Sequence, residues 1–365
     1  MKAFLKREPV FCAAFTAALI SCFFVRPDRT YLGYFDFRTL ALLYCLMVVV
    51  AGLREAGLFS ALAHRLCTRT KTVRAMGLTL TALSFFSAML ITNDVALLTF
   101  VPFSIVVLGM AHEEKSLVWV IVTQTVAANL GSVLTPVGNP QNLYLYSFYD
   151  MSAGEFVSAV LPLWLLSLVL VLLLCLRLPR AAVRVSLGER PLIDRRLMRL
   201  YIVLFLVCLL VVVRVISWAV MLALLTAALS VFDRKRLKSA DFMLLLSFVC
   251  FFVFSGNLAR IDAVADALSG LLQGRELVTA ALTSQVISNV PAALLLSGFT
   301  ENARELLLGV NIGGLGTPVA SLASLISLKL YSSAQGADSG AIMRCFLLVN
   351  IFMLIFLLAV FSVVL

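Results

Sequence analysis

The sequence predicts an all-α polytopic membrane protein, with about nine spanning helices, two re-entrant hairpins and two broken helices in two inverted repeats. Three observations lead to this fold class. The chain is 62% hydrophobic and 13% charged, whereas soluble domains carry roughly 25% charged residues. Several apolar runs approach the ~20 residues that cross a bilayer. Two polar segments rich in Asn, Gly and Pro interrupt apolar runs at matching places, and we expect one transmembrane domain over residues 1–365.

Spanning helices are expected where the chain stays almost free of charge. These stretches are 10–25, 39–53, 157–176, 199–213, 215–232, 242–254 and 345–365, with a further crossing inside 117–146. The solvent for most of this protein is therefore expected to be a lipid bilayer.

The basic residues predict the orientation of these helices. Five lie within 54–74, seven within 177–199 and four within 234–238. Such clusters are typical of cytoplasmic loops. We therefore expect a multi-pass protein of the cell (inner) membrane, with its N-terminus in the cytoplasm and its C-terminus outside. The net charge of +10 reflects these loops, and because no basic patch is interleaved with aromatic residues, we expect no nucleic-acid partner.

Residues 77–110 form two apolar arms around a polar tip, Thr92, Asn93 and Asp94. Each arm has about 16 residues, or about 24 Å of helix at 1.5 Å per residue, which is shorter than the ~30 Å hydrocarbon core. The parity of crossings allows either a re-entrant hairpin or two full spans. The short arms and the charged tip favour the hairpin.

The same layout recurs later in the chain. Residues 276–299 form two shorter apolar arms around Ser288 and Asn289. Each hairpin precedes an interrupted apolar run, "AANLGSVLTPVGN" (127–139) or "GVNIGGLGTPVAS" (309–321), at an offset of 182 residues. The identities are Asn129 with Asn311, Gly131 with Gly313, Thr135 with Thr317 and Pro136 with Pro318. Repeated identities at fixed spacing indicate an internal repeat.

We expect the repeats to cover 39–176 and 242–365 and to have opposite orientations. By parity, the first hairpin enters from the cytoplasmic side and the second from outside. Interrupted hydrophobic segments at matching places in inverted repeats are the best sequence indication of the binding site of a secondary transporter.

A broken helix exposes N–H groups at one new end and C=O groups at the other, and these ends attract anions and cations respectively. We therefore predict a substrate- and ion-binding site from the polar, glycine and proline residues of the tips and breaks. They are Thr92, Asn93, Asp94, Asn129, Gly131, Thr135, Pro136, Gly138, Asn139, Ser288, Asn289, Asn311, Gly313, Thr317 and Pro318. Sodium is expected at Asn93, Asn129, Asn289 and Asn311. Small and polar residues also pack membrane helices together, and packing stays the alternative for any single Gly or Ser.

Asp94 is the one acid inside these segments, and Val290 takes its place in the second half. Carboxylates within a membrane are costly and usually functional. The alternative is that Asp94 caps the arm 95–110. The two roles are compatible, because a capping carboxylate can also bind a proton or a cation.

At these residues the chain resembles the ion transporter superfamily, which includes divalent-anion/sodium symporters, citrate permeases, arsenite permeases and NhaD-type sodium/proton antiporters. The resemblance covers about residues 39–365 and depends on the two tips and the two breaks. It implies an elevator-type transporter, usually dimeric, in which the hairpins and broken helices move. Asn93 and Asn289 match the Ser-Asn-Thr tips of the dicarboxylate symporters, whereas Asp94 is closer to the arsenite-permease and antiporter branches.

We therefore expect a secondary transporter of a small anion, such as a carboxylate or an inorganic oxyanion, with sodium or protons as the coupling ion. A cation/proton antiporter with Asp94 as its carrier carboxylate is the alternative. An enzyme is not expected, because the sequence has no nucleophile–base pair and no metal-binding His/Asp cluster. The expected partners are a small-molecule anion, the lipid bilayer and a second copy of the chain. The substrate, the coupling ion, its stoichiometry and the direction of coupling stay open.

Overall fold

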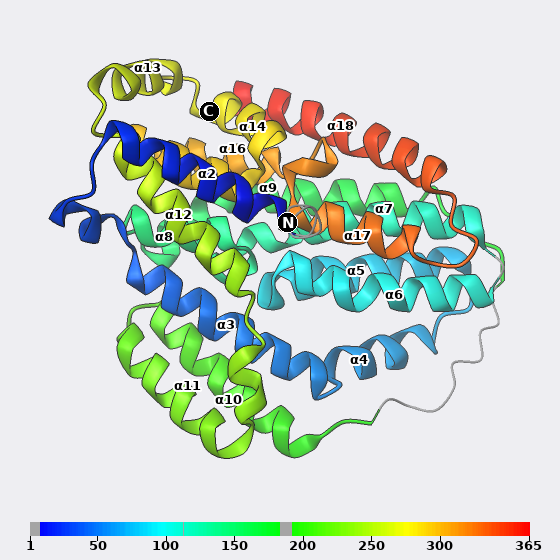
Figure 1. The fold of residues 1–365 in the computed structure, drawn as a ribbon. Coiled ribbons are helices and arrows are strands. Elements are labelled where there is room, and N and C mark those ends of the chain that lie inside the picture. The colour runs from blue at the N-terminus through cyan, green and yellow to red at the C-terminus, as the bar shows by residue number, and fades with distance from the viewer. Residues whose placement is uncertain (1–7, 112, 183–191) are drawn as a thin grey trace.

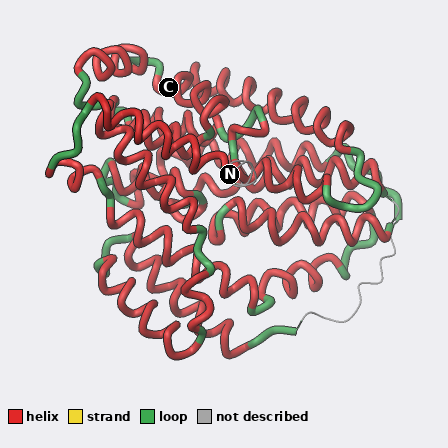
Figure 2. The backbone as a smooth tube through the Cα atoms, viewed as in Figure 1, coloured by secondary structure: helices red, strands yellow, loops and turns green. Residues whose placement is uncertain are grey.

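A computed structural model describes residues 8–111, 113–182 and 192–365. The described residues form helices joined by loops, and Figure 2 shows no strand among them. The α-helices, labelled in Figure 1, are α2 (Pro9–Phe24), α3 (Phe37–Glu55), α4 (Leu58–Cys67), α5 (Val73–Ile91), α6 (Asn93–Met110), α7 (Glu114–Gly131), α8 (Pro140–Phe148), α9 (Ala153–Cys175), α10 (Arg195–Val212), α11 (Trp218–Phe232), α12 (Phe242–Leu258), α13 (Asp262–Leu272), α14 (Glu276–Ile287), α15 (Asn289–Leu296), α16 (Ala303–Gly313), α17 (Leu322–Ser332) and α18 (Ser339–Val364). Short 3-10 turns are η1 (Arg29–Tyr34), η2 (Ser132–Leu134), η3 (Pro136–Gly138), η4 (Arg234–Lys238), η5 (Ser297–Phe299) and η6 (Pro318–Ala320).

Six of the described helices are long and apolar enough to cross a bilayer. They are α3, α5, α6, α7 extended through Leu134, α9 and α18, and the pair α12 and α13, bent by 101°, would be a seventh. The expected number of about nine stays a prediction, because several other helices are apolar but shorter. Two of the basic residues used for orientation, Arg184 and Arg190, lie outside the described residues, and so do Lys2, Lys6 and Arg7 near the N-terminus.

The arms of the first hairpin are longer than the expected 16 residues. α5 has 19 residues and α6 has 18, which is about 27–29 Å at 1.5 Å per residue. Thr72 begins α5 by accepting a hydrogen bond from the amide of Ala75 at 3.2 Å. Gly77 does not end the helix but lies inside it, where an added Cβ would be 2.3 Å from Leu178 and 2.9 Å from Val120. Arm length therefore no longer argues against two full spans.

The helices form two blocks in Figure 1. The lower block is α3 with α10 and α11, and the upper block holds α5 to α9 and α14 to α18. Gly52 lets α10 pack closely on α3, since a Cβ there would be 2.2 Å from the Tyr201 ring. The Tyr201 hydroxyl donates to Asp233 at 2.8 Å, and Arg236 of η4 pairs with Glu55 at the end of α3.

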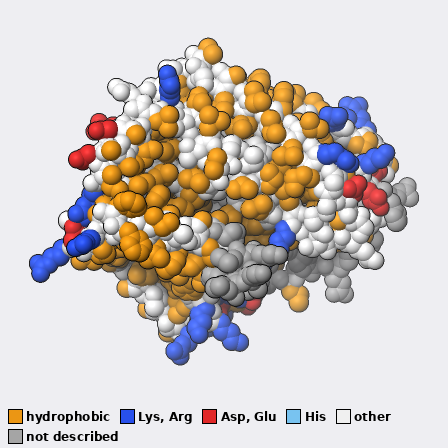
Figure 3. Space-filling view, turned by 45° about the horizontal axis from the view of Figure 1, so that its top comes forward, with side chains coloured by type: hydrophobic (Ala, Val, Ile, Leu, Met, Phe, Trp, Pro, Cys, Tyr) orange, Lys and Arg blue, Asp and Glu red, His pale blue; other side chains and the backbone are white. Residues whose placement is uncertain are grey.

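The surface agrees with a bilayer environment. Figure 3 shows hydrophobic side chains across the middle of one face and most Lys and Arg side chains near its margins. Leu348 of α18 is 73% exposed and Phe352 is 60% exposed. The central helix α7, in contrast, is buried at Gln124, Asn129 and most of its other positions. Apolar groups thus face outward while polar groups lie inside, as expected when lipid is the solvent.

Candidate functional site

The two hairpin tips share an uncommon backbone conformation. Thr92, between α5 and α6, has φ 70° and ψ 151°. Ser288, between α14 and α15, has φ 74° and ψ 155°. Residues with a Cβ seldom adopt positive φ, so the two predicted tips are matched in geometry as well as in sequence. Each tip residue is followed by a buried asparagine, Asn93 or Asn289, that begins the next helix.

The two breaks also share their construction. α7 ends at Gly131 and α16 at Gly313, and a 3-10 turn then begins at Pro136 in one half and at Pro318 in the other. Proline is suited to the first position of such a turn, since its missing N–H would have no partner there. α8 and α17 follow, so both halves contain the predicted broken helix.

A threonine joins each break to its hairpin. Thr135 donates its hydroxyl hydrogen bond to the carbonyl of Met89, and Thr317 donates to the carbonyl of Gln285 at 3.2 Å. Met89 and Gln285 each lie three residues before their tip residue. The same contact therefore occurs at the same place in both halves.

The predicted glycines are sites of close approach. An added Cβ at Gly131 would be 2.1 Å from the carbonyl oxygen of Phe85, and one at Gly313 would be 2.8 Å from the Cα of Ala281. Phe85 and Ala281 each lie seven residues before their tips. A Cβ at Gly138 would be 2.0 Å from the carbonyl oxygen of Ser132, so Gly138 lets the first break fold back on itself.

Asn129 of α7 lies at the centre of the first group of polar contacts. Its Oδ1 accepts from the Asn93 amide at 2.9 Å and from the Ser321 hydroxyl at 3.0 Å. Its own amide donates to the Ser324 hydroxyl at 3.2 Å. A helix of the first half is thus bonded to the tip of its own hairpin and to the break of the second half.

Asn311 of α16 makes the reciprocal contacts. Its Oδ1 accepts from the Asn139 amide at 3.2 Å, and its amide donates to Asn142 Oδ1 at 2.7 Å and to the Leu307 carbonyl at 2.8 Å. At the offset of 182, Asn139 and Asn142 correspond to Ser321 and Ser324. Each half therefore supplies the partners of the other half's central asparagine.

The exposed backbone of the two breaks is held by different side chains. The Asn142 amide donates to the carbonyls of Ser132, Val133 and Thr135 at 3.4, 3.1 and 3.3 Å. In the second half, the side-chain amide of Gln285 donates to the carbonyls of Gly313 and Leu315 at 2.8 and 3.0 Å. The side-chain oxygen of Gln285, Oε1, accepts from the Thr317 N–H at 2.9 Å.

The predicted residues do not meet as a fully symmetric set. Asn93 bonds to Asn129, but the hydrogen bonds of the described residues include none between Asn289 and Asn311, because Asn311 is bonded to the first half instead. Sequence reasoning left Gln285 and the serines at 321 and 324 out of the predicted site. The 182-residue offset applied to Asn139 and Asn142 would have found the serines.

Asp94 does not cap its helix, so that alternative is wrong. α6 begins at Asn93, its N-cap residue is Thr92 and Asp94 lies inside the first turn. The Asp94 amide instead donates to Asn93 Oδ1 at 3.0 Å. The physical reason is that the sharp turn at Thr92 starts the helix two residues earlier than the expected arm 95–110. A carboxylate in this first turn still interacts favourably with the helix dipole.

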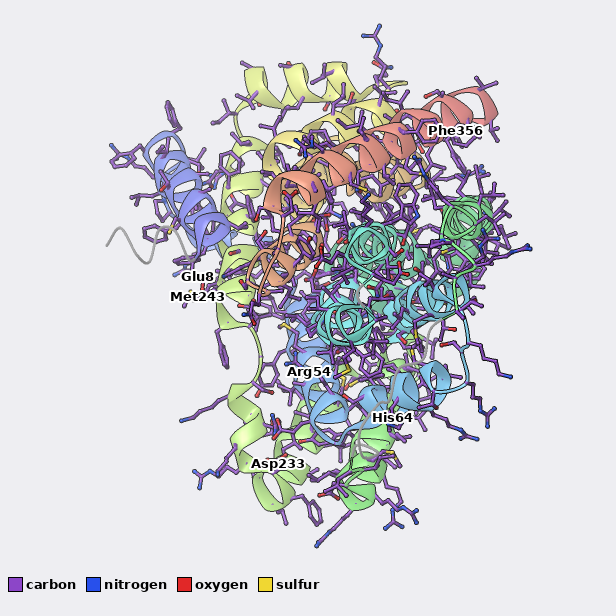
Figure 4. The ribbon with its side chains drawn as sticks, turned by 90° about the vertical axis from the view of Figure 1, so that its right-hand side faces the viewer. Glu8, Arg54, His64, Asp233, Met243 and Phe356 are labelled. Carbon is purple, nitrogen blue, oxygen red and sulfur yellow. The ribbon has the colours of Figure 1, made fainter. Side chains whose placement is uncertain are left out.

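Asp94 lines a cavity of about 240 Å³ between the two blocks. Thr92 and Asn139 of the predicted site line it, and so do Arg54 at the end of α3 and Asp241 before α12. Figure 4 shows Arg54 at the level between the upper helices and the α10–α11 block that carries Asp233. The cavity thus joins the tip of the first hairpin to charged groups of both signs.

Known proteins resemble this chain in sequence and in fold. A family model described as CitMHS, citrate transporter, matches residues 5–305. The chain belongs to the CitMHS family. It is 32% identical to an uncharacterized transporter of Methanocaldococcus jannaschii, MJ0456, over 81% of each chain. It is 31% identical to the inner membrane protein YbiR of Escherichia coli, over 81% of this chain and 80% of that one.

The YdaH transporter of Alcanivorax borkumensis has a similar fold, with a TM-score of 0.55 over 92% of this chain and 87% of that one, at 16% identity. This CitMHS-family chain is therefore a multi-pass membrane transporter of the anion-permease type, and it is not an enzyme. The predicted membership of the ion transporter superfamily is confirmed.

Proposed function

We propose that the chain is a secondary active transporter that moves a small anion, such as citrate, another small carboxylate or an inorganic oxyanion, with sodium or protons as the coupling ion. Support comes from the citrate transporter family to which it belongs and from the cavity beside the first tip. Arg54 in that cavity offers an anion a positive charge, and Thr92 and Asn139 offer hydrogen-bonding groups.

The single observation that carries the proposal is the exchange of partners around Asn129 and Asn311. Asn129 bonds to serines of the second break, and Asn311 bonds to asparagines of the first. Two broken helices that meet in this way bring helix N–H ends and C=O ends together within a membrane, which suits an anion and a cation bound side by side. Asn93, Asn129, Asn289 and Asn311 are the proposed sodium ligands.

We further propose that the two halves are inverted repeats and that transport uses an elevator-type movement. The arrangement of the two blocks supports both proposals. In Figure 1 the outer ends of α5 and α6 lie at the right edge, whereas α13 and the start of α14 lie at the left. Hairpins that enter from opposite sides are what inverted repeats require. The hairpins and broken helices would move as one body against α3, α10 and α11, with the cavity at Asp94 at their boundary.

The test is uptake of radiolabelled anions into proteoliposomes that contain the purified chain, with sodium and pH gradients imposed separately. We expect at least one small carboxylate or oxyanion to accumulate only when one of the two gradients is present. Empty liposomes are the control. Accumulation that ignores both gradients would exclude secondary active transport, and failure of every anion in the panel would exclude the proposed substrate class.

One observation favours a cation/proton antiporter as the second candidate. Asp241 lines the same cavity as Asp94, so the chain has a second acid near the predicted carrier carboxylate. Under this function, an imposed sodium or potassium gradient would drive proton movement in proteoliposomes without any anion. A pH-sensitive dye inside the liposomes measures that movement.

We further propose a homodimer in the cell membrane, with the N-terminus in the cytoplasm and the C-terminus outside. The mass of the purified protein in lipid nanodiscs, measured by light scattering, tests the dimer. A particle that holds one 39.8 kDa chain would contradict it.

A further inference from the structure

A large apolar groove lies between α4 and α5 and shares no lining residue with the cavity at Asp94. Its inner end, at Leu53 and Ile91, adjoins Arg54 and Thr92 of that cavity along the chain. The groove has a volume of about 990 Å³ and is closed by the end of α3 and by Ile202 and Phe205 of α10. Its lining therefore comes from α4, from α3 and α10 of the lower block, and from α5, the first arm of the first hairpin (α5 and α6, called hairpin 1).

The walls of the groove are two apolar stripes. On α4 the stripe is Leu58, Leu62 and Leu66, at intervals of four residues, which places them on one helix face. On α5 the stripe is Leu78, Ala82, Phe86 and Leu90, at the same interval. Phe86 is 47% exposed and Leu90 is 49% exposed, so these stripes are only partly covered by protein.

The mouth of the groove is basic. Arg69, Thr70, Lys71 and Thr72, in the connection between α4 and α5, all belong to its lining. Arg69 and Lys71 are exposed. Residues 54–76 contain five Lys or Arg residues, and Glu55 is their only acid. An apolar cavity with two cations at one end has the charge pattern of a phospholipid site, since basic pockets between membrane helices bind anionic head groups.

We propose that this groove binds one anionic phospholipid, with its phosphate at Arg69 and Lys71 and its acyl chains along α5. Leu90 lies twelve residues after Leu78, which is about 18 Å along the helix at 1.5 Å per residue. One leaflet of a ~30 Å hydrocarbon core has about the same depth. Because hairpin 1 and the lower block both line the groove, the bound lipid touches both.

The experiment is native mass spectrometry of the full-length protein, delipidated and then titrated with phosphatidylglycerol or phosphatidylcholine. We expect one phosphatidylglycerol to bind more tightly than any phosphatidylcholine. In the double variant Arg69→Glu/Lys71→Glu this binding should weaken about 30-fold, since each basic residue near an anionic lipid contributes on the order of a few-fold to tenfold in affinity. The control Arg234→Glu/Lys235→Glu removes two exposed cations of η4 that do not line the groove, and it should bind like the wild type.

A second variant keeps the charges and fills the groove. Ala82→Trp should lose the tightly bound lipid while its unfolding temperature shows that the chain is folded. Equal binding of both lipids by the wild type would overturn the proposal. Unchanged phosphatidylglycerol binding in both groove variants would also overturn it. Binding lost equally in the η4 control would also overturn it, because the attraction would then be general. None of these outcomes depends on which anion the protein transports.

Discussion

The two broken helices carry the same Thr-Pro-Val sequence but are held in different ways. In the first, Asn142 of α8 holds three carbonyls of the break that precedes its own helix. In the second, Gln285 holds two carbonyls and one N–H from α14, an arm of the hairpin. The residue at the place of Gln285 in the first hairpin is Met89, which can offer no comparable hydrogen bonds from its side chain.

This difference has a mechanical consequence. The three carbonyls of the first break keep the Asn142 amide when the first hairpin moves, because Asn142 lies on α8, directly after that break. Only the hydrogen bond from Thr135 to Met89 joins this break to its hairpin. The hydrogen bonds of the second break depend on the position of the second hairpin (α14 and α15, called hairpin 2), because Gln285 lies on α14. Within the body that we propose to move, we therefore expect the first break to keep its shape and the second break to respond to small shifts of hairpin 2.

The largest effect is expected from the two central asparagines. Asn129→Ala and Asn311→Ala should each lower uptake at least tenfold, since a buried polar partner contributes about 1–3 kcal/mol when the groups around it are left unpaired. Asn311→Ala should also lower the unfolding temperature more, because its partners include Asn142, the clamp of the first break. Uptake and thermal unfolding measure the two effects.

Asn350→Ala is the matched control for both variants. Asn350 is a buried asparagine of α18 whose amide donates to Phe346 of its own helix. It should keep most of the uptake activity. Near-normal uptake by Asn129→Ala and Asn311→Ala would assign these residues to packing alone.

The second prediction compares the clamps directly. Asn142→Ala leaves three carbonyls of the first break, two of them in buried residues, without their amide donor. We therefore expect a loss of stability of about 1–3 kcal/mol. Gln285→Met places the residue of the first half in the second, and we expect slower uptake with a smaller change in the unfolding temperature. The opposite pattern, with Gln285→Met unfolding more easily than Asn142→Ala, would show that the second break is the fixed one.

The third prediction concerns Asp94, which only the first half has. Asp94→Asn keeps the shape but removes the charge, and we expect loss of gradient-driven accumulation with a weaker effect on substrate exchange, which need not release the coupling ion. Asp241→Asn should have the smaller effect, because Asp241 caps α12 through the Leu244 amide at 2.9 Å and Asn caps equally well. Wild-type coupling in Asp94→Asn would move the cation site to the neutral oxygens around Asn129.

The smallest functional effect is expected from labels that test the opposite orientation of the halves. Glu114→Cys changes the exposed first residue of α7, and Glu301→Cys changes an exposed residue two positions before α16. In a background without the native cysteines, uptake by both variants should be unchanged. A membrane-impermeant thiol reagent should reach Glu114→Cys from the cytoplasm and Glu301→Cys from outside. Labelling of both cysteines from the same side would contradict the opposite orientation of the two halves.

The tips and breaks could be predicted from sequence because their polar residues stand out against apolar runs and recur at fixed spacing. Gly131, Thr135 and Pro136 predicted a break, and the structure places one there. The length of α5 could not be predicted in this way. Gly77 looked like the end of an arm, but it is a packing position against α7 and Leu178.

The hydrogen-bond partners within the site could not be predicted from the sequence, for a different reason. A hydrogen bond between Asn311 and Asn142 joins residues 169 positions apart, and only the packing of the two halves decides it. The hydrogen bond between Asn93 and Asn129 has no counterpart between Asn289 and Asn311 among the described residues. Asn311 bonds instead to Asn139 and Asn142 at the first break. The repeated sequence therefore does not give the same hydrogen bonds in both halves.

The positive φ angles at Thr92 and Ser288 lower the stability of the protein, while the side chains of the same two residues contribute to the site. This backbone region is almost restricted to glycine and costs other residues on the order of 1–3 kcal/mol. Glycine would therefore make both tips easier to fold. The Ser288 hydroxyl, however, donates to the Ala320 carbonyl of the second break at 3.2 Å, and Thr92 lines the cavity at Asp94. Thr92→Gly and Ser288→Gly should thus give a protein that withstands heat better and transports more slowly.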